Sequence, residues 1–222
     1  MDFKNKRDII FIILAGFFIT NAIVAELIGG KLIQFFGIFT QSVGIVLWPI
    51  IFVLTDLINE YFGKDGVKKL TYITMGLIVF MFLILFIALN IPATSFSPVS
   101  DMAFHEVFGQ SMWIIVGSVV AFGVSQIVDV YIFTKFKLST GNKYIWLRAT
   151  GSTVVSQLVD TFIVQFIAFV LPAKWTMSEF LINASWGYGF KLLIAILLIP
   201  FIYAGHYLIG IYIKPKNLKG TE

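Results

Sequence analysis

The chain has 222 residues, of which 59% are hydrophobic and only 13% are charged. Soluble domains carry roughly 25% charged residues, so this composition excludes a surface that faces only water and indicates helices that face lipid. The sequence contains no cysteine, which excludes disulfides, thiolate catalysis and cysteine-based zinc or iron–sulfur sites.

Six stretches are apolar and long enough to cross a bilayer, because about 20 mostly apolar residues span its hydrocarbon core. In chain order they cover residues 9–28, 43–60, 71–91, 111–134, 148–171 and 186–212. We therefore predict an all-α, polytopic membrane protein with six transmembrane helices, in which residues 1–222 form a single transmembrane domain. The first apolar run is too long for a signal-peptide core, so we interpret it as a retained helix.

Basic residues gather on one side of this predicted bundle. Of the 16 Lys and Arg residues, 13 flank the N-terminus, the connections after the second and fourth helices, and the C-terminus. The opposite loops hold only Lys31 and Lys174. Short loops rich in Lys and Arg stay in the cytosol, so we predict that both termini are cytoplasmic. The net charge of +4 is then a topology signal and does not indicate a nucleic-acid partner.

Two of the predicted external segments differ from ordinary polar loops in their composition. Residues 29–42 are apolar enough to lie at the membrane interface or to dip inward. Residues 92–110 contain no Lys or Arg, and we expect an external loop with one short amphipathic turn.

The second predicted helix ends in TDLINEYFG, which places Asp56, Asn59 and Glu60 on one helical face. An ionisable side chain at membrane depth costs at least about 2.5–3.5 kcal/mol, and such groups face the bundle interior or a cavity. We expect Asp56 to have an interior role and place it, with Asn59, in the candidate substrate site. Glu60 lies at the cytosolic boundary, where it is either solvated or paired with Arg148 or Lys64, and we expect a structural or gating role for Glu60 and Arg148.

The fourth and fifth helices share one pattern, since SQIVD begins at Ser125 and SQLVD begins at Ser156. Each pattern carries a Gln–Asp pair, namely Gln126 with Asp129 and Gln157 with Asp160. The two helices run in opposite directions, so the resemblance is inverted and suggests internal inverted pseudo-symmetry. Hydrogen bonding between helices explains the serines, but two Gln–Asp pairs exceed what packing needs. We interpret the pairs as substrate-binding, with Asp160 near the midplane.

Four further residues complete the candidate substrate site: Asn21, Lys191, Trp186 and Tyr188. Asn21 either binds helices together or contacts a ligand. Lys191 either extends to the interface or neutralises one of the aspartates. The two aromatic residues fit an interfacial belt and could also stack on a planar ligand. Glu26, near the outer end of the first helix, is expected to meet external water or to pair with Lys31.

Three stretches together resemble the queuosine precursor transporter family, also called the vitamin uptake transporter family. They are TDLINEYFG at 55–63, RATGSTVVSQLVDTF at 148–162, and the segment from Lys191 to Pro200. The sequence departs mildly from the family pattern at Tyr61–Phe62, where Val-Tyr is commoner. The resemblance implies a bacterial inner-membrane protein that imports a 7-deazaguanine, such as the 7-cyano or 7-aminomethyl form or queuine, for making the tRNA nucleoside queuosine. No catalytic residue, cofactor or metal is expected.

The polar residues suit such a cargo. A guanine-like edge donates N–H bonds that a carboxylate accepts, while Gln or Asn amides serve its carbonyl and ring nitrogen. We hypothesise that Asp160 or Asp129 binds the aminopyrimidine edge, that the two glutamines supply complementary bonds, and that an aromatic ring stacks on the bicycle.

Two other classes of protein stay open. A substrate-binding subunit of a vitamin-type energy-coupling-factor importer also has six spans, but Ala15, Ala22 and Ala25 do not form its Ala-x-x-x-Ala docking stripe. An intramembrane enzyme is less compatible, because the only histidines are His105 and His206 and no nucleophile–base motif accompanies them.

The transport mode is equally open at this stage. Proton relay through Asp56, Asp129 and Asp160 and facilitated diffusion both fit the sequence, as do a monomer and a homodimer.

Overall fold

The computed structural model describes residues 6–35, 37, 39–109, 112–140 and 145–213. The helices are α1 (Lys6–Ile28), α2 (Leu47–Leu89), α3 (Asp101–Phe108), α4 (Met112–Thr140), α5 (Ile145–Gln165), α6 (Met177–Leu197) and α7 (Ile199–Ile213). Two strands, β1 (Leu32–Phe35) and β2 (Phe39–Ser42), a 3-10 turn η1 (Val43–Val46) and a π-helical turn η2 (Phe166–Val170) complete the described elements.

The distribution of side chains is that of a multi-pass membrane protein. Five helical segments are long and apolar enough to cross a membrane: Lys6–Ile28, Val43–Leu89, Asp101–Ser139, Gly151–Val170 and Met177–Leu197. Ile199–Tyr212 is a shorter apolar helix. Large apolar side chains such as Phe80 and Phe86 are exposed, whereas Gln126, Asp129 and Gln157 are fully or almost fully buried. Polar residues inside and apolar residues outside are what lipid demands.

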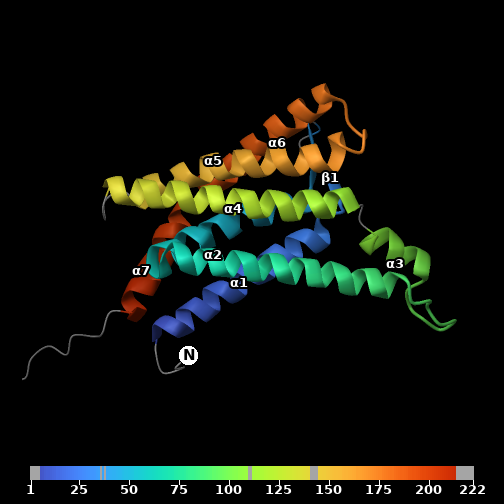
Figure 1. Cartoon of the computed structure of the whole chain (residues 1–222), viewed down its shortest axis with the longest axis horizontal. Helices are drawn as coiled ribbons and strands as arrows, with labels where there is room; N and C mark the ends of the chain where they lie inside the picture. Colours follow the sequence, from blue (N-terminus) through green and yellow to red (C-terminus); the bar gives the residue numbers. More distant parts are fainter. Residues whose placement is uncertain (1–5, 36, 38, 110–111, 141–144, 214–222) are drawn as a thin grey trace, which may run out of the picture.

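The segment α2 contains both the second and the third predicted spans. Its backbone leaves helical geometry at Gly63, where φ is 75° and ψ is 173°, a conformation that glycine adopts at little cost. Figure 1 shows both ends of α2 at the same end of the bundle, so the chain folds back at this residue. The predicted loop between the two spans is therefore reduced to a turn, because the flanking residues continue the helices.

Two ends of the bundle can be defined from this arrangement. The hairpin end carries β1, β2 and α3, whereas the Gly63 end carries the first residues of α1, the Gly63 turn and the C-terminal residues of α4 (Figure 1). At the Gly63 end, the Arg7 guanidinium donates to the Tyr61 carbonyl at 2.6 Å, which fixes the start of α1 against the turn.

The last predicted span, 186–212, differs from the structure in where its helix begins and in whether it is continuous. Helix α6 begins earlier, at Met177, because Thr176 and Glu179 form a capping box: the Thr176 hydroxyl accepts from the Glu179 amide, and the Glu179 carboxylate accepts from the Thr176 amide. The helix then breaks before α7 next to Pro200, which cannot donate a backbone hydrogen bond.

The strands β1 and β2 form an antiparallel hairpin, with Leu32 opposite Ser42 and Phe35 opposite Phe39. This hairpin departs from the all-α prediction and occupies the segment expected to lie at the interface. Residues 92–110 contain α3 as expected, although it is a helix of 8 residues rather than a single turn. Its N-cap is Ser100, whose hydroxyl accepts from the Ala103 amide at 3.2 Å.

Helices α4 and α5 lie antiparallel and side by side (Figure 1). A Cβ atom added at Gly117 of α4 would lie 3.0 Å from the Val164 carbonyl of α5, so a small residue there permits close approach of the two backbones. This approach brings the two SQ-x-x-D patterns together.

Candidate functional site

The two SQ-x-x-D patterns form reciprocal hydrogen bonds across the α4–α5 interface. The Ser156 hydroxyl of α5 donates to Asp129 of α4 at 2.8 Å, and the Ser125 hydroxyl of α4 donates to Asp160 of α5 at 3.4 Å. All four side chains are buried, with exposed fractions of 3% or less. The two copies of the sequence pattern thus contact each other through two reciprocal hydrogen bonds, and we call these four residues the crossed pairs.

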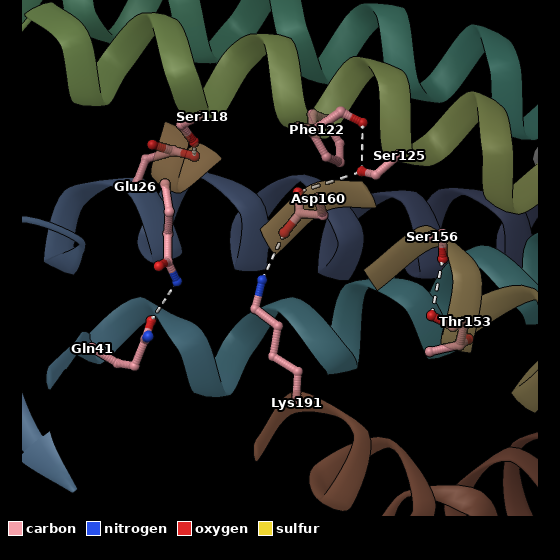
Figure 2. Close-up of polar contacts among 10 residues, drawn as sticks. Glu26, Gln41, Ser118, Phe122, Ser125, Thr153, Ser156, Asp160 and Lys191 are labelled. Carbon is pink, nitrogen blue, oxygen red and sulfur yellow. Dashed lines mark hydrogen bonds and ion pairs between the residues drawn. The ribbon is translucent and has the colours of Figure 1, made fainter. Parts of the chain in front are cut away.

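The two aspartates of the crossed pairs differ in charge compensation. The Lys191 ammonium of α6 lies 2.6 Å from Asp160, and both side chains are 5% exposed. Figure 2 shows Lys191 reaching from α6 toward Asp160, with Ser125 on the other side of the carboxylate. Of the two interpretations of Lys191, the structure thus shows neutralisation of an aspartate. Within the described residues Asp129 has no ion-pair partner.

A cavity of about 140 Å³ opens beside Asp160 and Lys191 toward the hairpin end, and we call it the outer cavity. Its polar lining includes Glu26, Thr40, Gln41, Ser42, Ser118 and Gln165, and its aromatic lining consists of Trp48, Phe169 and Trp175. Carboxylates, amides and flat rings therefore surround one space, which is typical of a site for a polar, planar ligand.

Glu26 is a member of this cavity that the sequence analysis misplaced. The expectation that it meets external water or pairs with Lys31 is wrong, because Glu26 is only 4% exposed and accepts a hydrogen bond from Ser118. Figure 2 shows the two side chains facing each other between α1 and α4. The physical reason is that the hairpin after α1 folds over the end of this helix, since Gly44 packs against the Ala25 carbonyl.

The β-hairpin reaches into the bundle through Gln41. Its amide donates to the Asn183 carbonyl of α6 at 2.9 Å and accepts from the Gln165 amide of α5 at 3.4 Å. Gly187 of α6 makes room for this contact, because a Cβ atom there would lie 2.5 Å from the Gln41 amide nitrogen. The hairpin therefore forms one wall of the outer cavity and is attached to α5 and α6.

Gln41 and Gln165 were not identified as site residues from the sequence, although the sequence contained a signal for Gln165. Gln157, Thr161 and Gln165 recur every four residues along α5, which places them on one helical face. Gln41 had no comparable signal, because its position depends on how the hairpin folds back.

Toward the Gly63 end, the polar interior continues between α2, α4 and α5. The Thr55 hydroxyl donates to Gln126 at 3.1 Å, and the Ser152 hydroxyl donates to Asp56 at 3.4 Å. The expected interior location of Asp56 is confirmed by its exposed fraction of 3%. Asn59 is equally buried, and within the described residues its amide nitrogen has no hydrogen-bond partner.

Glu60 forms an ion pair that the sequence analysis did not anticipate. The Lys137 ammonium of α4 lies 3.2 Å from the Glu60 carboxylate and also donates to the Glu60 carbonyl. Arg148, the partner expected from the sequence together with Lys64, has a side chain that lies outside the described residues.

Two buried glutamines hold polar atoms that no described residue satisfies. Neither the amide nitrogen nor the amide oxygen of Gln157 has a partner within the described residues, although the side chain is fully buried. The amide nitrogen of Gln126 is likewise without a partner in the same part of the chain. Buried polar atoms in native proteins are almost always bonded, so these amides are the groups to which water or a polar ligand would bind.

Of the ten predicted substrate-binding residues, only Asp160 and Lys191 line the outer cavity. Five others are buried elsewhere in the bundle: Gln157, Asp129, Gln126, Asp56 and Asn59. The remaining three make other contacts or face outward. Asn21 donates to the Phe17 carbonyl of its own helix at 2.8 Å, and Trp186 is 49% exposed on α6. Tyr188 donates to the Val154 carbonyl of α5 at 3.1 Å. None of the three lines the outer cavity, whose aromatic residues are Trp48, Phe169 and Trp175 in place of Trp186 and Tyr188.

A second cavity, of about 500 Å³, lies between α2 and α4 toward the Gly63 end, and we call it the inner cavity. Its polar lining combines Gln126 and the carboxylate Asp65 with basic and hydroxyl side chains: Lys64, Lys68, Lys135, Thr71, Tyr72, Tyr131 and Thr134. Three apolar side chains complete it. Within the described residues, no group of three or more His, Asp or Glu side chains could hold a metal ion.

The sequence matches the model of a family described as "Putative vitamin uptake transporter" over residues 42–205. It is 32% identical to the "Probable queuosine precursor transporter" of Bacillus subtilis, over 78% of this chain and 75% of the relative. The protein of the same name in Haemophilus influenzae is 27% identical, over 83% of this chain and 75% of the relative. The "Queuosine precursor transporter" of Escherichia coli is 28% identical, over 71% and 69%. No solved structure matches the chain.

Proposed function

This chain belongs to the vitamin uptake transporter family, and we propose that it imports a queuosine precursor, a 7-deazaguanine, across a bacterial inner membrane into the cytosol. The names of the three relatives support this cargo. The site geometry supports it independently, through one observation: the buried Asp160–Lys191 pair faces a cavity that also contains amides and indole rings.

The chemistry of that cavity matches a deazaguanine. The aminopyrimidine edge presents two N–H donors side by side, which a carboxylate such as Asp160 or Glu26 accepts. Gln165 and Lys191 are donors for the ring carbonyl, and Trp48 or Trp175 offers a flat surface for the bicycle. A buried ionic group also gives selectivity, because a ligand that leaves it unsatisfied is strongly disfavoured.

The direction of transport in this proposal follows from charge and topology. We count six crossings: α1, the two halves of α2, α4, α5, and the broken pair α6–α7. Lys64, Lys68, Lys135 and Lys137 lie at the Gly63 end, so the rule that basic loops stay inside makes that end cytoplasmic. The outer cavity then opens toward the extracytoplasmic side, where an imported cargo first arrives.

The importer-subunit alternative gains no support from α1. The alanines Ala22 and Ala25, which would have to be accessible for a partner helix, are 0% and 2% exposed because they pack inside the bundle. We therefore propose a transporter that works without an ATPase partner.

A binding panel tests the proposed cargo. The purified protein in detergent is titrated with 7-cyano-7-deazaguanine, 7-aminomethyl-7-deazaguanine, queuine, guanine and adenine, with binding followed by calorimetry. We expect a deazaguanine to bind at least about tenfold more tightly than adenine, whose edge reverses the donor and acceptor pattern.

Two variants locate the binding. Glu26→Gln keeps the hydrogen bond from Ser118 but removes the charge, and we expect weaker binding of the aminomethyl form, which is a cation, than of the cyano form. Glu106→Gln on the exposed helix α3 removes a charge far from the cavity and should leave all affinities unchanged. Equal affinity of wild-type protein for adenine and for the deazaguanines would contradict the proposed cargo.

A further inference from the structure

Five carboxylates from α1, α2, α4 and α5 follow one another along the α4–α5 interface, each bonded to a neighbouring helix. From the hairpin end to the Gly63 end, the bonded pairs are Glu26–Ser118, Asp160–Ser125, Asp129–Ser156, Asp56–Ser152 and Glu60–Lys137. We call this series the carboxylate ladder. Its order follows both helices, since the α4 members run from 118 to 137 and the α5 members run back from 160 to 152.

The ladder connects the two ends of the bundle in short steps. Successive members of α5 are four residues apart, which corresponds to about 6 Å along a helix. Two further contacts join neighbouring pairs: Glu26 and Asp160 are close enough to interact electrostatically, and the Ser152 hydroxyl interacts with Asp129 as well as with Asp56. The first two carboxylates line the outer cavity, and Gln126, beside the crossed pairs, lines the inner cavity.

Serine is a partner that tolerates both charge states of a carboxyl group. Its hydroxyl donates to an ionised carboxylate and can instead accept from a protonated carboxylic acid. Each of the four Ser–carboxyl pairs can therefore persist while a proton arrives or leaves. A Lys or Arg partner favours the ionised form of the carboxylate, so a proton resides there less readily than on a carboxylate bonded only to serine.

Asp129 is the member of the ladder best suited to carry a proton. It is fully buried and has no ion-pair partner within the described residues, whereas Asp160 is held by Lys191 and Glu60 by Lys137. An isolated ionised carboxylate is expensive at membrane depth. The fully buried Gln157 of α5, whose amide is unsatisfied by any described residue, adds polar atoms to the same part of the helix pair.

The charged groups around Asp129 come from three packed elements. Helix α5 supplies Asp160, with Lys191 of α6 behind it, and α2 supplies Asp56 and Glu60. The side chain of Arg148, also on α5, lies outside the described residues. Two of these three carboxylates are paired with lysines, Asp160 with Lys191 and Glu60 with Lys137.

We propose that this protein moves a proton together with its substrate and that Asp129 carries that proton. In each cycle a proton leaves a hydronium ion in the outer cavity, which Asp160 lines, crosses between the crossed pairs and forms an O–H bond on the Asp129 carboxylate. That bond breaks when the proton passes to the Asp56 side and enters the water at the Gly63 end. No oxidant or other co-reactant is required. The inference rests on the proposed transport function, since the proton accompanies the deazaguanine.

The test uses the whole protein reconstituted in liposomes that contain the pH-sensitive dye pyranine. Exchange of labelled 7-cyano-7-deazaguanine at equal pH on both sides reports transport without a proton gradient. Accumulation under an imposed pH gradient, with the acidic side outside, reports coupling. Dye fluorescence on addition of the cargo reports proton movement directly.

For wild-type protein we expect exchange, at least about fivefold accumulation above the equilibrium level, and proton entry that follows the cargo. Asp129→Asn keeps an acceptor for Ser156 but cannot bind the proton. Relative to the exchange rate measured for the same variant, accumulation and proton entry should disappear. Asp129→Glu should restore both. Asp101→Asn, a change at an exposed carboxylate of α3, should behave as wild type.

The results distinguish failure of the proton coupling from failure of the proposed transport function. Exchange without proton entry in the wild type would overturn the coupling and leave the transport function intact, and this measurement needs no variant that could misfold. Accumulation by Asp129→Asn equal to that of the wild type would remove Asp129 as the carrier. Absence of exchange by the wild type would overturn the transport of this cargo, and the coupling with it.

Discussion

The two halves of the crossed pairs have the same sequence pattern and different surroundings. Asp160 lies toward the hairpin end, beside the outer cavity, and is paired with Lys191. Asp129 lies toward the Gly63 end, is fully buried and has only hydroxyl partners within the described residues. The difference teaches that a repeated motif is specialised by what a third helix brings to it, because α6 supplies a cation to one copy only.

The largest expected difference in stability is between variants that remove the charge of Asp160 and of Asp129. Asp160→Asn leaves the Lys191 ammonium buried without its counter-ion, and breaking a buried ion pair in this way costs about 3–5 kcal/mol. Asp129→Asn removes no ion pair and should cost about 1 kcal/mol or less. The melting temperature of the purified proteins in detergent measures the contrast.

A double variant sharpens this first comparison. Asp160→Asn combined with Lys191→Met removes both charges, so it should regain most of the lost thermal stability while binding of the deazaguanine stays weak. Equal destabilisation by the two single aspartate variants would show that the Lys191 pair does not distinguish the halves.

A smaller effect, on cargo affinity, is expected from adding a methyl group at Gly187, where α6 contacts the β-hairpin. Gly187→Ala would place a methyl group 2.5 Å from the Gln41 amide nitrogen, which must shift the hairpin wall of the outer cavity, and such overpacking costs about 1–3 kcal/mol. We expect cargo affinity to fall about tenfold in a titration. Gly189→Ala, two residues away with nothing within 4 Å of the added carbon, is the matched control and should bind as wild type.

The smallest expected effect is the difference in melting temperature between variants of the two serines of the crossed pairs. Ser156→Ala removes a hydrogen bond of 2.8 Å and Ser125→Ala one of 3.4 Å. Interhelical hydrogen bonds in membrane proteins average about 0.6 kcal/mol, so Ser156→Ala should lower the melting temperature by a few degrees and Ser125→Ala by less. The reverse order would mean that the shorter bond is not the stronger one here.

Much of the architecture could be predicted because lipid imposes simple rules on the sequence. Apolar length located the helices, and the buried aspartates followed from the high cost of charge in a membrane. The break between α6 and α7 was harder, because it interrupts a continuous apolar stretch and depends on a single residue. The charged segment around Gly63 predicted a connection, but it did not show that both helices continue up to a turn at one glycine. The start of α6 was missed although Thr176 and Glu179 carry the capping-box spacing.

The site was predicted in part, for an equally physical reason. Asp160 and Lys191 could be identified as polar residues within apolar helices, but the membership of Glu26 and Gln41 depends on the β-hairpin that folds over the end of α1. Trp186 and Tyr188 are near Lys191 in sequence, yet the helical rotation places Trp186 outward and directs Tyr188 to α5. Sequence proximity was a poor guide to which aromatic residues face the cavity.

The absence of cysteine from the sequence provides the most direct test of the central claim, that the outer cavity holds the cargo and opens outward. Thr40→Cys introduces the single thiol into that cavity, and a membrane-impermeant thiol reagent is added to intact cells with and without 7-cyano-7-deazaguanine. We predict labelling from outside that the cargo slows at least about fivefold. Thr134→Cys, in the inner cavity, should be labelled only after the cells are permeabilised. Labelling of Cys at position 40 that is unaffected by the cargo, or that requires permeabilised cells, would contradict the account.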